Sequence, residues 1–172
     1  DATWKSIAEI LIRKAKEGVE VRFMYDGFGS NGLSKTFIKT LEAAGVQTAP
    51  FYKIKLIALA NRLNYRNHRK IVVIDGEYGY VGGFNVGEEY ISKDPEVGFW
   101  RDTHVRIEGE AVDDLNERFL LDWCYAAEEE IEDYDKYSSD GNKDAGDVGV
   151  QIVTSGPDHK EQYIRNAYLK LI

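Results

Sequence analysis

The residues best suited to chemistry in this chain are His68 and Lys70, which precede an uncharged, β-branched run at positions 71–74. In a β-strand, side chains alternate between the two faces, so residues two apart point the same way. His68 and Lys70 therefore share one face, whereas Arg69 and Asp75 have the opposite parity. A potential nucleophile beside a fixed positive charge suits chemistry on a phosphate group. We expect phosphate chemistry at the head of this strand.

The residues after this strand predict a hairpin that ends in two glycines. Asp75-Gly76 is a strong signal for a tight turn, and positions 78–81 predict a second strand. Gly82-Gly83 then allows a sharp turn and a close approach of the backbone to a ligand. The run at 71–74 carries no polar residue, which is typical of a central strand buried on both faces.

A basic stretch leads into the histidine. No Asp or Glu occurs between residues 43 and 74, whereas Lys and Arg recur along this stretch. We read positions 53–67 mainly as a long loop, and such loops are often functional. Clustered positive charge raises the local concentration of anions. From charge alone this is a solvated basic loop, but its position favours a rim for an anionic substrate, formed by Arg62, Arg66 and Arg69.

Hydrophobic periodicity predicts an α/β fold in which helices pack on a central sheet. The expected helices lie at 4–17, 34–44, 110–127 and 161–172. The expected strands lie at 19–25, 46–52, 71–74, 78–81, 100–107 and 148–153. Ser34 is the expected N-cap of the second helix, and Pro50 places the second strand at an edge.

The charge of the chain is unevenly distributed. The net charge of −8 over 172 residues arises mainly at 128–147, where nine acidic residues stand against two lysines. This segment is the expected linker between residues 1–127 and 148–172. The rest is nearly neutral and has no basic surface outside 53–70, which argues against a nucleic-acid duplex as partner. We expect no metal site, because the chain has a single cysteine and no two of its three histidines are spaced as metal ligands usually are.

The motif His68-x-Lys70-x4-Asp75, followed by Gly82-Gly83-x-Asn85, resembles the HKD motif of the phospholipase D superfamily. The segments NYRNHRKIVVIDGEYGYVGGFNVGEEY, FWRDTHVRIEGEAV, RFLLDW and SGPD are similar, in this order, to the bacterial cardiolipin synthase branch. This resemblance implies a phospholipase D-like α-β-α sandwich with a mixed central sheet. It also implies a cofactor-free phosphatidyl transfer through a phosphohistidine, in which two phosphatidylglycerols give cardiolipin and glycerol.

The resemblance assigns roles to individual residues. His68 would be the nucleophile or its acid–base counterpart. Lys70 would hold the non-bridging phosphate oxygens, and Asn85 would donate a hydrogen bond to the same phosphate. In the superfamily, a carboxylate from a later strand orients the histidine, which makes Asp102 the expected acceptor of its N–H. The alternative is a surface carboxylate paired with Arg101 or Arg106.

Three further motif residues are expected to support the structure rather than the chemistry. Asp75 has the wrong parity and lies at a turn, so we expect it to tie down the local backbone. Gly82 and Gly83 are expected to shape the turn that carries Asn85.

The resemblance also predicts how the chain is organised. Residues 1–127 would be a first HKD repeat, 128–147 the acidic linker, and 148–172 the opening strand and helix of a second repeat. Members of this branch carry two repeats after membrane spans, so we expect a soluble fragment of a longer enzyme. Its parent would lie at the bacterial cell membrane with the catalytic part facing the cytoplasm.

One HKD repeat supplies only one of the two histidines that the reaction needs. A second repeat, or a second copy of this chain, would complete the site, and the fragment alone is expected to be inactive or weakly active. Two alternatives stay open: a phospholipase D-type phosphodiesterase or nuclease acting as a homodimer, and an inactive phospholipid-binding fragment. Residues 148–153 are also expected to fill a vacant strand position in the sheet of the first repeat, in the same chain or in a neighbouring one.

Overall fold

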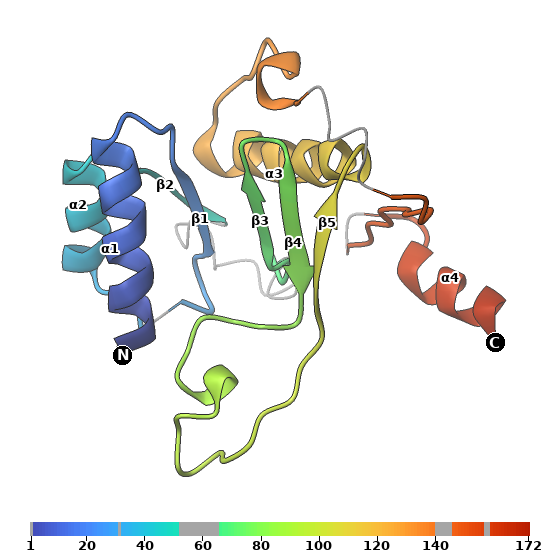
Figure 1. The fold of residues 1–172 in the computed structure, drawn as a ribbon, viewed down its shortest axis with the longest axis horizontal. Helices are drawn as coiled ribbons and strands as arrows, with labels where there is room; N and C mark the ends of the chain where they lie inside the picture. Colours follow the sequence, from blue (N-terminus) through green and yellow to red (C-terminus); the bar gives the residue numbers. More distant parts are fainter. Residues whose placement is uncertain (1, 31, 52–65, 140–145, 157–158) are drawn as a thin grey trace.

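The computed structural model describes residues 2–30, 32–51, 66–139, 146–156 and 159–172. Its strands form two sheets (Figure 1). β1 (Arg22–Asp26) and β2 (Gln47–Phe51) are parallel, whereas β3 (Ile71–Ile74), β4 (Tyr78–Gly82) and β5 (His104–Glu108) are antiparallel in the order β3-β4-β5. The α/β class is confirmed. The expected mixed sheet is divided, in the described part of the chain, into a parallel and an antiparallel half.

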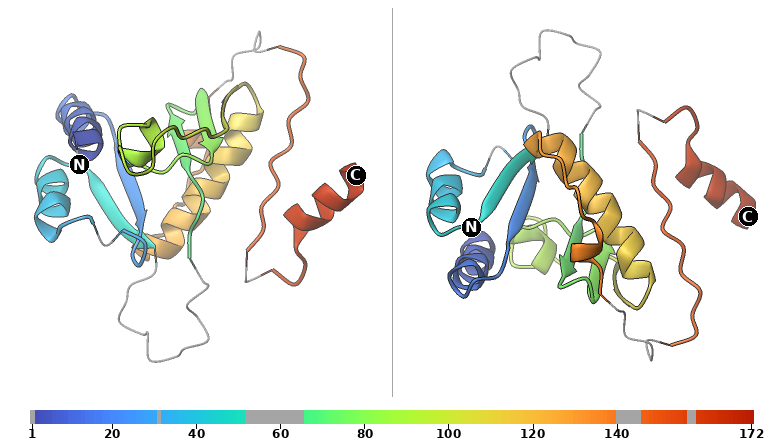
Figure 2. Two further views of the ribbon diagram at one scale, coloured as in Figure 1. Left: turned by 90° about the horizontal axis from the view of Figure 1, so that it is seen from below. Right: turned by 90° about the horizontal axis from the view of Figure 1, so that it is seen from above.

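The β1–β2 sheet is covered by helices on both faces. α1 (Ala2–Lys16) and α2 (Lys35–Ala43) pack on one face, and α3 (Ala111–Ala127) packs on the other (Figures 1 and 2). One buried cluster lies on each side of this sheet; the first contains Ala8, Leu41 and Val46, and the second Ala49, Trp123 and Ala126. This half is therefore an α-β-α sandwich, as expected.

Local signals in the sequence explain these helices. Ser34 caps α2 by accepting a hydrogen bond from the amide of Phe37, as its side chain predicts. α3 buries an apolar face at helical spacing, which includes Val112, Leu115 and Trp123.

The β3–β4–β5 sheet is covered by α3 on one face only. Val73, Gly79 and Ile107 form one cross-strand row on the face toward α3. Gly79 lies so close to the α3 side chains that an added Cβ would come within 2.9 Å of Leu115. On the opposite face Val72 is 53% exposed. The prediction that the strand at 71–74 is central and buried on both faces is wrong, because β3 pairs only with β4 among the described strands and no described helix covers its outer face.

The turn between β3 and β4 is confirmed. Asp75 and Gly76 have φ values of 54° and 70°, two consecutive left-handed residues as in a type I′ turn. The amide of Glu77 closes the turn by donating to the carbonyl of Ile74 at 3.0 Å.

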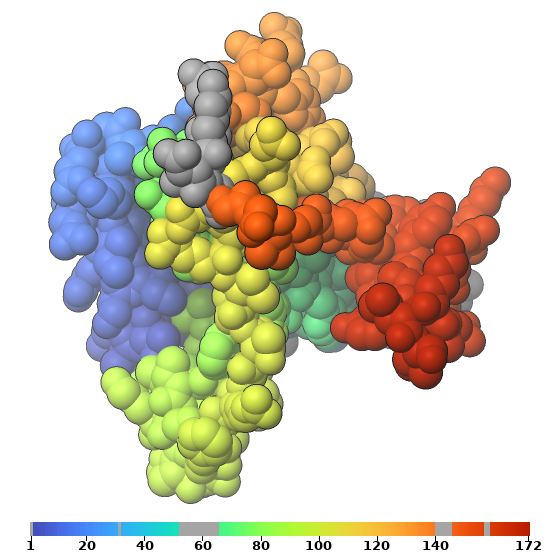
Figure 3. All heavy atoms as spheres, turned by 45° about the vertical axis from the view of Figure 1, so that its right-hand side comes forward, coloured from blue at the N-terminus to red at the C-terminus, as the bar shows by residue number. Residues whose placement is uncertain are grey.

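The C-terminal part of the described chain differs from its prediction. Residues 148–153 form no strand, and they add to neither sheet. The expectation that they fill a strand position in their own chain is therefore wrong. α4 (Tyr163–Leu171) is confirmed as a helix, but none of its residues is buried and it projects from the body (Figures 1 to 3). The loop expected at 53–67 lies mostly outside the described residues.

Candidate active site

The fold brings the chemical residues of the motif to one end of the antiparallel sheet. His68 precedes the start of β3, Asn85 follows the end of β4, and Asp102 precedes the start of β5. Neighbouring strands of an antiparallel sheet run in opposite directions, so these three chain positions meet at the same end. The amide of Gly83 donates to the carbonyl of Thr103 at 3.0 Å and extends the pairing toward the site.

Asp75 occupies the opposite end of β3, in the turn. The whole strand therefore separates it from His68. Its left-handed φ of 54° at an exposed turn position supports a local role in the hairpin.

His68 and Lys70 have the same parity as Val72, which lies on the face away from α3. His68 is exposed, and the Nζ of Lys70 donates to the backbone carbonyl of His68 at 2.8 Å. This bond holds the ammonium group next to the backbone of His68, just before the start of β3. The pair can present a nucleophile and a positive charge to one phosphate.

Asn85 and Asp102 are connected through two aromatic residues of the segment between β4 and β5, which protrudes from the sheet (Figure 1). The Nδ2 of Asn85 donates to the hydroxyl of Tyr90 at 2.7 Å, and the Tyr90 and Trp100 rings meet edge to face at 5.0 Å. The indole N–H of Trp100 donates to Asp102 at 3.2 Å. Sequence reasoning missed Tyr90 and Trp100 as site residues, although both lie in the segments that resemble the cardiolipin synthase branch.

Asp102 has different hydrogen-bond partners from those expected. Its carboxylate accepts hydrogen bonds from Trp100 and from the amide of Thr103, and Arg106 pairs instead with Glu108 at 2.6 Å. No bond to His68 is found among the described atoms, so the orienting role of Asp102 stays a prediction.

Gly82 and Gly83 pack against the segment that carries Asp102. A Cβ on Gly82 would come within 2.5 Å of the backbone and ring of His104, and one on Gly83 would overlap the carboxylate of Asp102. The Nδ1 of His104 is buried and has no hydrogen-bond partner among the described residues. The two glycines thus permit the close approach of β4 to the segment that precedes β5.

The arginines expected to form an anionic rim are engaged in ion pairs. Arg66 lies 3.3 Å from Asp26, and Arg69 lies 2.9 Å from Asp122. Arg62 is outside the described residues. The structure gives the rim no support from Arg66 or Arg69, and the rim stays a prediction.

The Asp26 carboxylate shows how such pairing acts on a titratable group. Burial alone would raise its pKa. Hydrogen bonds from the amide of Gly29, the guanidinium of Arg66 and the amide of Phe28 outweigh burial and lower the pKa below its ordinary value of 3.8.

Asp122 is the functional candidate that sequence reasoning missed. It lies on α3, is buried, and accepts hydrogen bonds from Asn67, Arg69 and Arg118. Its signal in the sequence is a single carboxylate placed next to Trp123, within the apolar face of a helix. Charged residues are almost never fully buried unless they are paired.

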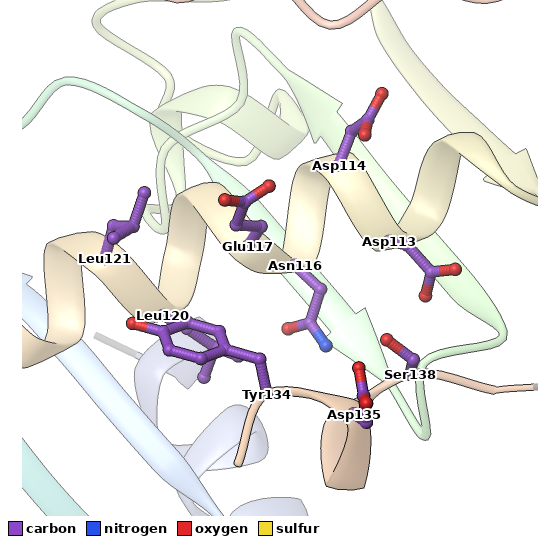
Figure 4. A pocket seen from close by; sticks show the side chains of 9 residues that line it. All are labelled: Asp113, Asp114, Asn116, Glu117, Leu120, Leu121, Tyr134, Asp135 and Ser138. Atoms are coloured by element: carbon purple, nitrogen blue, oxygen red, sulfur yellow. The ribbon is translucent and has the colours of Figure 1, made fainter. Parts of the chain in front are cut away.

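A pocket of about 390 Å³ lies elsewhere, between α3 and the 3-10 helix at Asp135–Tyr137 (Figure 4). It includes none of the motif residues, and four of the side chains that line it are the carboxylates Asp113, Asp114, Glu117 and Asp135. A site lined by this much negative charge repels a phosphate, so the pocket is no alternative to the site at His68.

The described residues contain neither a candidate metal site nor a candidate membrane-spanning helix. No group of three or more His, Cys, Asp or Glu residues among them could hold a metal ion. No helix in this part of the chain is both long and apolar enough to cross a membrane.

Comparison with known proteins identifies close relatives. Residues 3–123 match the protein family described as "Cardiolipin synthase, PLD-like domain". The chain is 49% identical to the major cardiolipin synthase ClsA of Bacillus subtilis and 47% identical to a cardiolipin synthase of Oceanobacillus iheyensis. Both matches include the whole chain, which spans 36% and 35% of the two relatives. No solved structure gives a significant match.

Proposed function

Because this chain belongs to the phospholipase D-like domains of the cardiolipin synthase family, we propose that it is one catalytic repeat of a phosphatidyltransferase. The observation that supports the proposal is the convergence of the segments of His68, Asn85 and Asp102 at one end of the antiparallel sheet, with Lys70 bonded to the backbone of His68. The chain spans about a third of its curated relatives, which supports a longer enzyme with further parts.

The proposed reaction has two displacements at phosphorus. The neutral imidazole of His68 attacks the phosphorus of phosphatidylglycerol, a P–N bond forms, and the P–O bond to the glycerol headgroup breaks. A second imidazolium donates its proton to the leaving glycerol oxygen and becomes neutral. The hydroxyl of a second phosphatidylglycerol loses its proton to this base, attacks phosphorus, breaks the P–N bond and releases cardiolipin. Lys70 and Asn85 stabilise the negative charge on the phosphate oxygens in both steps.

The second imidazole would come from a second HKD repeat of the same enzyme or from a second copy of this chain. A two-copy site requires an isologous interface, in which each copy places its His68 opposite the other. The substrate lies in a bilayer, so the enzyme would work at the bacterial membrane with this domain on the cytoplasmic side.

A turnover assay on the full-length enzyme tests the reaction type. With phosphatidylglycerol vesicles, we expect equal amounts of cardiolipin and free glycerol. Phosphatidic acid with glycerol, but without cardiolipin, would indicate a hydrolase instead. Replacement His68→Ala is expected to lower turnover by at least about 10³-fold, since the covalent step is lost. His159→Ala is the control, because His159 lies beside Tyr163 near α4, away from the motif.

The chain alone is expected to have little or no activity, because it supplies one histidine per copy. Phosphodiester turnover is compared for the chain and its His68→Ala variant, with the molar mass determined under assay conditions. Turnover by a strict monomer that depends on His68 would contradict the need for a second imidazole.

A further inference from the structure

We propose that Asp122 is a positioning residue that holds the backbone of His68 in place through the residues on either side of it. The carboxylate of Asp122 contacts Asn67 and Arg69, the residues immediately before and after His68. The consequence for catalysis rests on the function proposed above, whereas the effect on His68 itself does not.

The contacts are short and converge on one carboxylate. The Oδ2 atom of Asp122 accepts from the Nδ2 of Asn67 at 3.2 Å and from the Nη1 of Arg69 at 2.9 Å. The Oδ1 atom accepts from Arg118, one turn earlier on α3, at 2.6 Å. The Asp122 side chain is only 6% exposed. A buried carboxylate is stable with such a set of charge-assisted donors, and each partner is costly to remove.

The segment around His68 needs this support, because β3 begins only at Ile71. Residues 67–70 carry no regular secondary structure. The Oδ1 of Asn67 accepts from the amide of Arg69 at 2.9 Å, so one side chain spans the histidine and closes a local turn. The same Asn67 side chain donates to Asp122, and this bond anchors the local turn to helix α3.

The anchor acts on both sides of the histidine. Asn67 and Arg69 are bonded to Asp122 on α3, and His68 between them is exposed, so the network holds the backbone of His68 while its imidazole stays accessible. The network also keeps the Arg69 side chain from turning toward an anionic substrate, because its guanidinium donates to Asp122 and to the carbonyl of Ser155. A carboxylate serves here better than an amide, since both of its oxygens accept hydrogen bonds from cationic donors.

The test compares the chain with its Asp122→Asn variant in two local measurements by NMR. The first is hydrogen exchange at the amide of Arg69, which is protected by Asn67; we expect exchange to be about tenfold faster in the variant. The second is the ¹⁵N spectrum of the His68 imidazole, assigned with His68→Ala; we expect its signals to shift or broaden. Signals of His104 and His159 are expected to stay unchanged.

A matched control separates positioning from a general loss of stability. Glu20→Gln removes another carboxylate with several donors, Arg22 and Lys136 among them, and none of these contacts the segment at 67–70. It is expected to lower the melting temperature while leaving both local measurements unchanged. Equal changes in the two variants would overturn the proposal.

A milder variant covers the case in which Asp122→Asn does not fold. Asn67→Ala leaves the pairs of Asp122 with Arg69 and Arg118 intact and is expected to give the same two local changes. If Asp122→Asn does fold, the change in the double variant is expected to be smaller than the sum of the two single changes, because both variants disrupt the bond between Asn67 and Asp122. An unchanged His68 spectrum in Asn67→Ala would overturn the proposal.

A turnover assay in the full-length enzyme shows whether the position matters for the reaction. We expect kcat to fall in Asp122→Asn while KM stays close to its original value, since the substrate contacts are retained. If His68→Ala leaves turnover intact, the proposed function fails, but the NMR result still decides the role of Asp122.

Discussion

The two sheets of this protein differ in how they are covered. The β1–β2 sheet lies between helices on both faces, and its side chains form two buried clusters. The β3–β4–β5 sheet has α3 on one face, and its other face presents exposed aliphatic side chains such as Val72 and Ile74, while His68 and Lys70 lie just before its first strand. The first sheet thus carries most of the buried core, whereas the second leaves one face open beside the proposed site. α3 contacts both sheets.

The largest effect on stability is expected at the core between α3 and the covered sheet. Trp123 is 2% exposed and packs with Ala49 and Ala126. Trp123→Ala is expected to lower the free energy of unfolding by about 3–5 kcal/mol, since it leaves a large cavity. Urea denaturation measures this. Leu121→Ala, at an exposed position of the same helix, serves as control, and equal losses would contradict the assigned core.

A smaller effect is expected where α3 meets the half-covered sheet. Gly79→Val places a side chain against Leu115 and is expected to lower the free energy of unfolding by about 1–3 kcal/mol. Gly149→Val is its matched control, because a Cβ there meets no atom within 4 Å. Thermal unfolding of both variants is the measurement. If the two variants unfold at the same temperature, α3 is not pressed against this sheet.

A pH-dependent effect is expected where β1 ends. The folded state lowers the pKa of Asp26 below its ordinary 3.8, so this carboxylate stabilises the fold fully above that value. The contribution is lost as the pH falls through the folded-state pKa. Denaturation at a series of pH values from 7 down to about 3 measures the slope, which is expected to be smaller in Asp26→Asn. An unchanged slope would show that the hydrogen bonds from Gly29, Arg66 and Phe28 do not lower the pKa of this carboxylate in solution.

The smallest effect is expected on the uncovered face of the β3–β4–β5 sheet. Val72→Thr exchanges an exposed side chain for one of similar shape, and the free energy of unfolding is expected to change by no more than about 0.5 kcal/mol. Chemical denaturation at two protein concentrations measures it. A loss of unfolding free energy well above this value that grows with protein concentration would mean that a second copy covers this face. Both sheets would then be covered on two faces.

Elements with local signals were predictable from the sequence. The cap at Ser34, the Asp75-Gly76 turn and the apolar spacing of α3 each involve residues close in the chain, and the structure confirms all three. The roles of His68 and Lys70 stay a prediction, because their shared parity was inferred from strand geometry and β3 begins only at Ile71.

Features that depend on distant partners could not be predicted in this way. The sequence of positions 71–74 shows that this strand is apolar. It does not show whether a helix covers the outer face of the strand. The valines at 148, 150 and 153 suit a strand, yet a strand requires a neighbour, and the described chain supplies none. The bonds of Asp122 to Asn67 and Arg69 connect residues more than fifty positions apart, and no local pattern predicts such a contact.

The exposed hairpin has a consequence for solubility. β3 consists of four uncharged, β-branched residues, and one of its edges is unpaired in the described structure. Such a strand is a template for the addition of further strands and therefore for aggregation. Lys70 and Asp75 flank it with one charge of each sign, in the position of gatekeeper residues. Lys70 and Asp75 would thereby oppose the addition of further strands to β3, whatever part they take in catalysis.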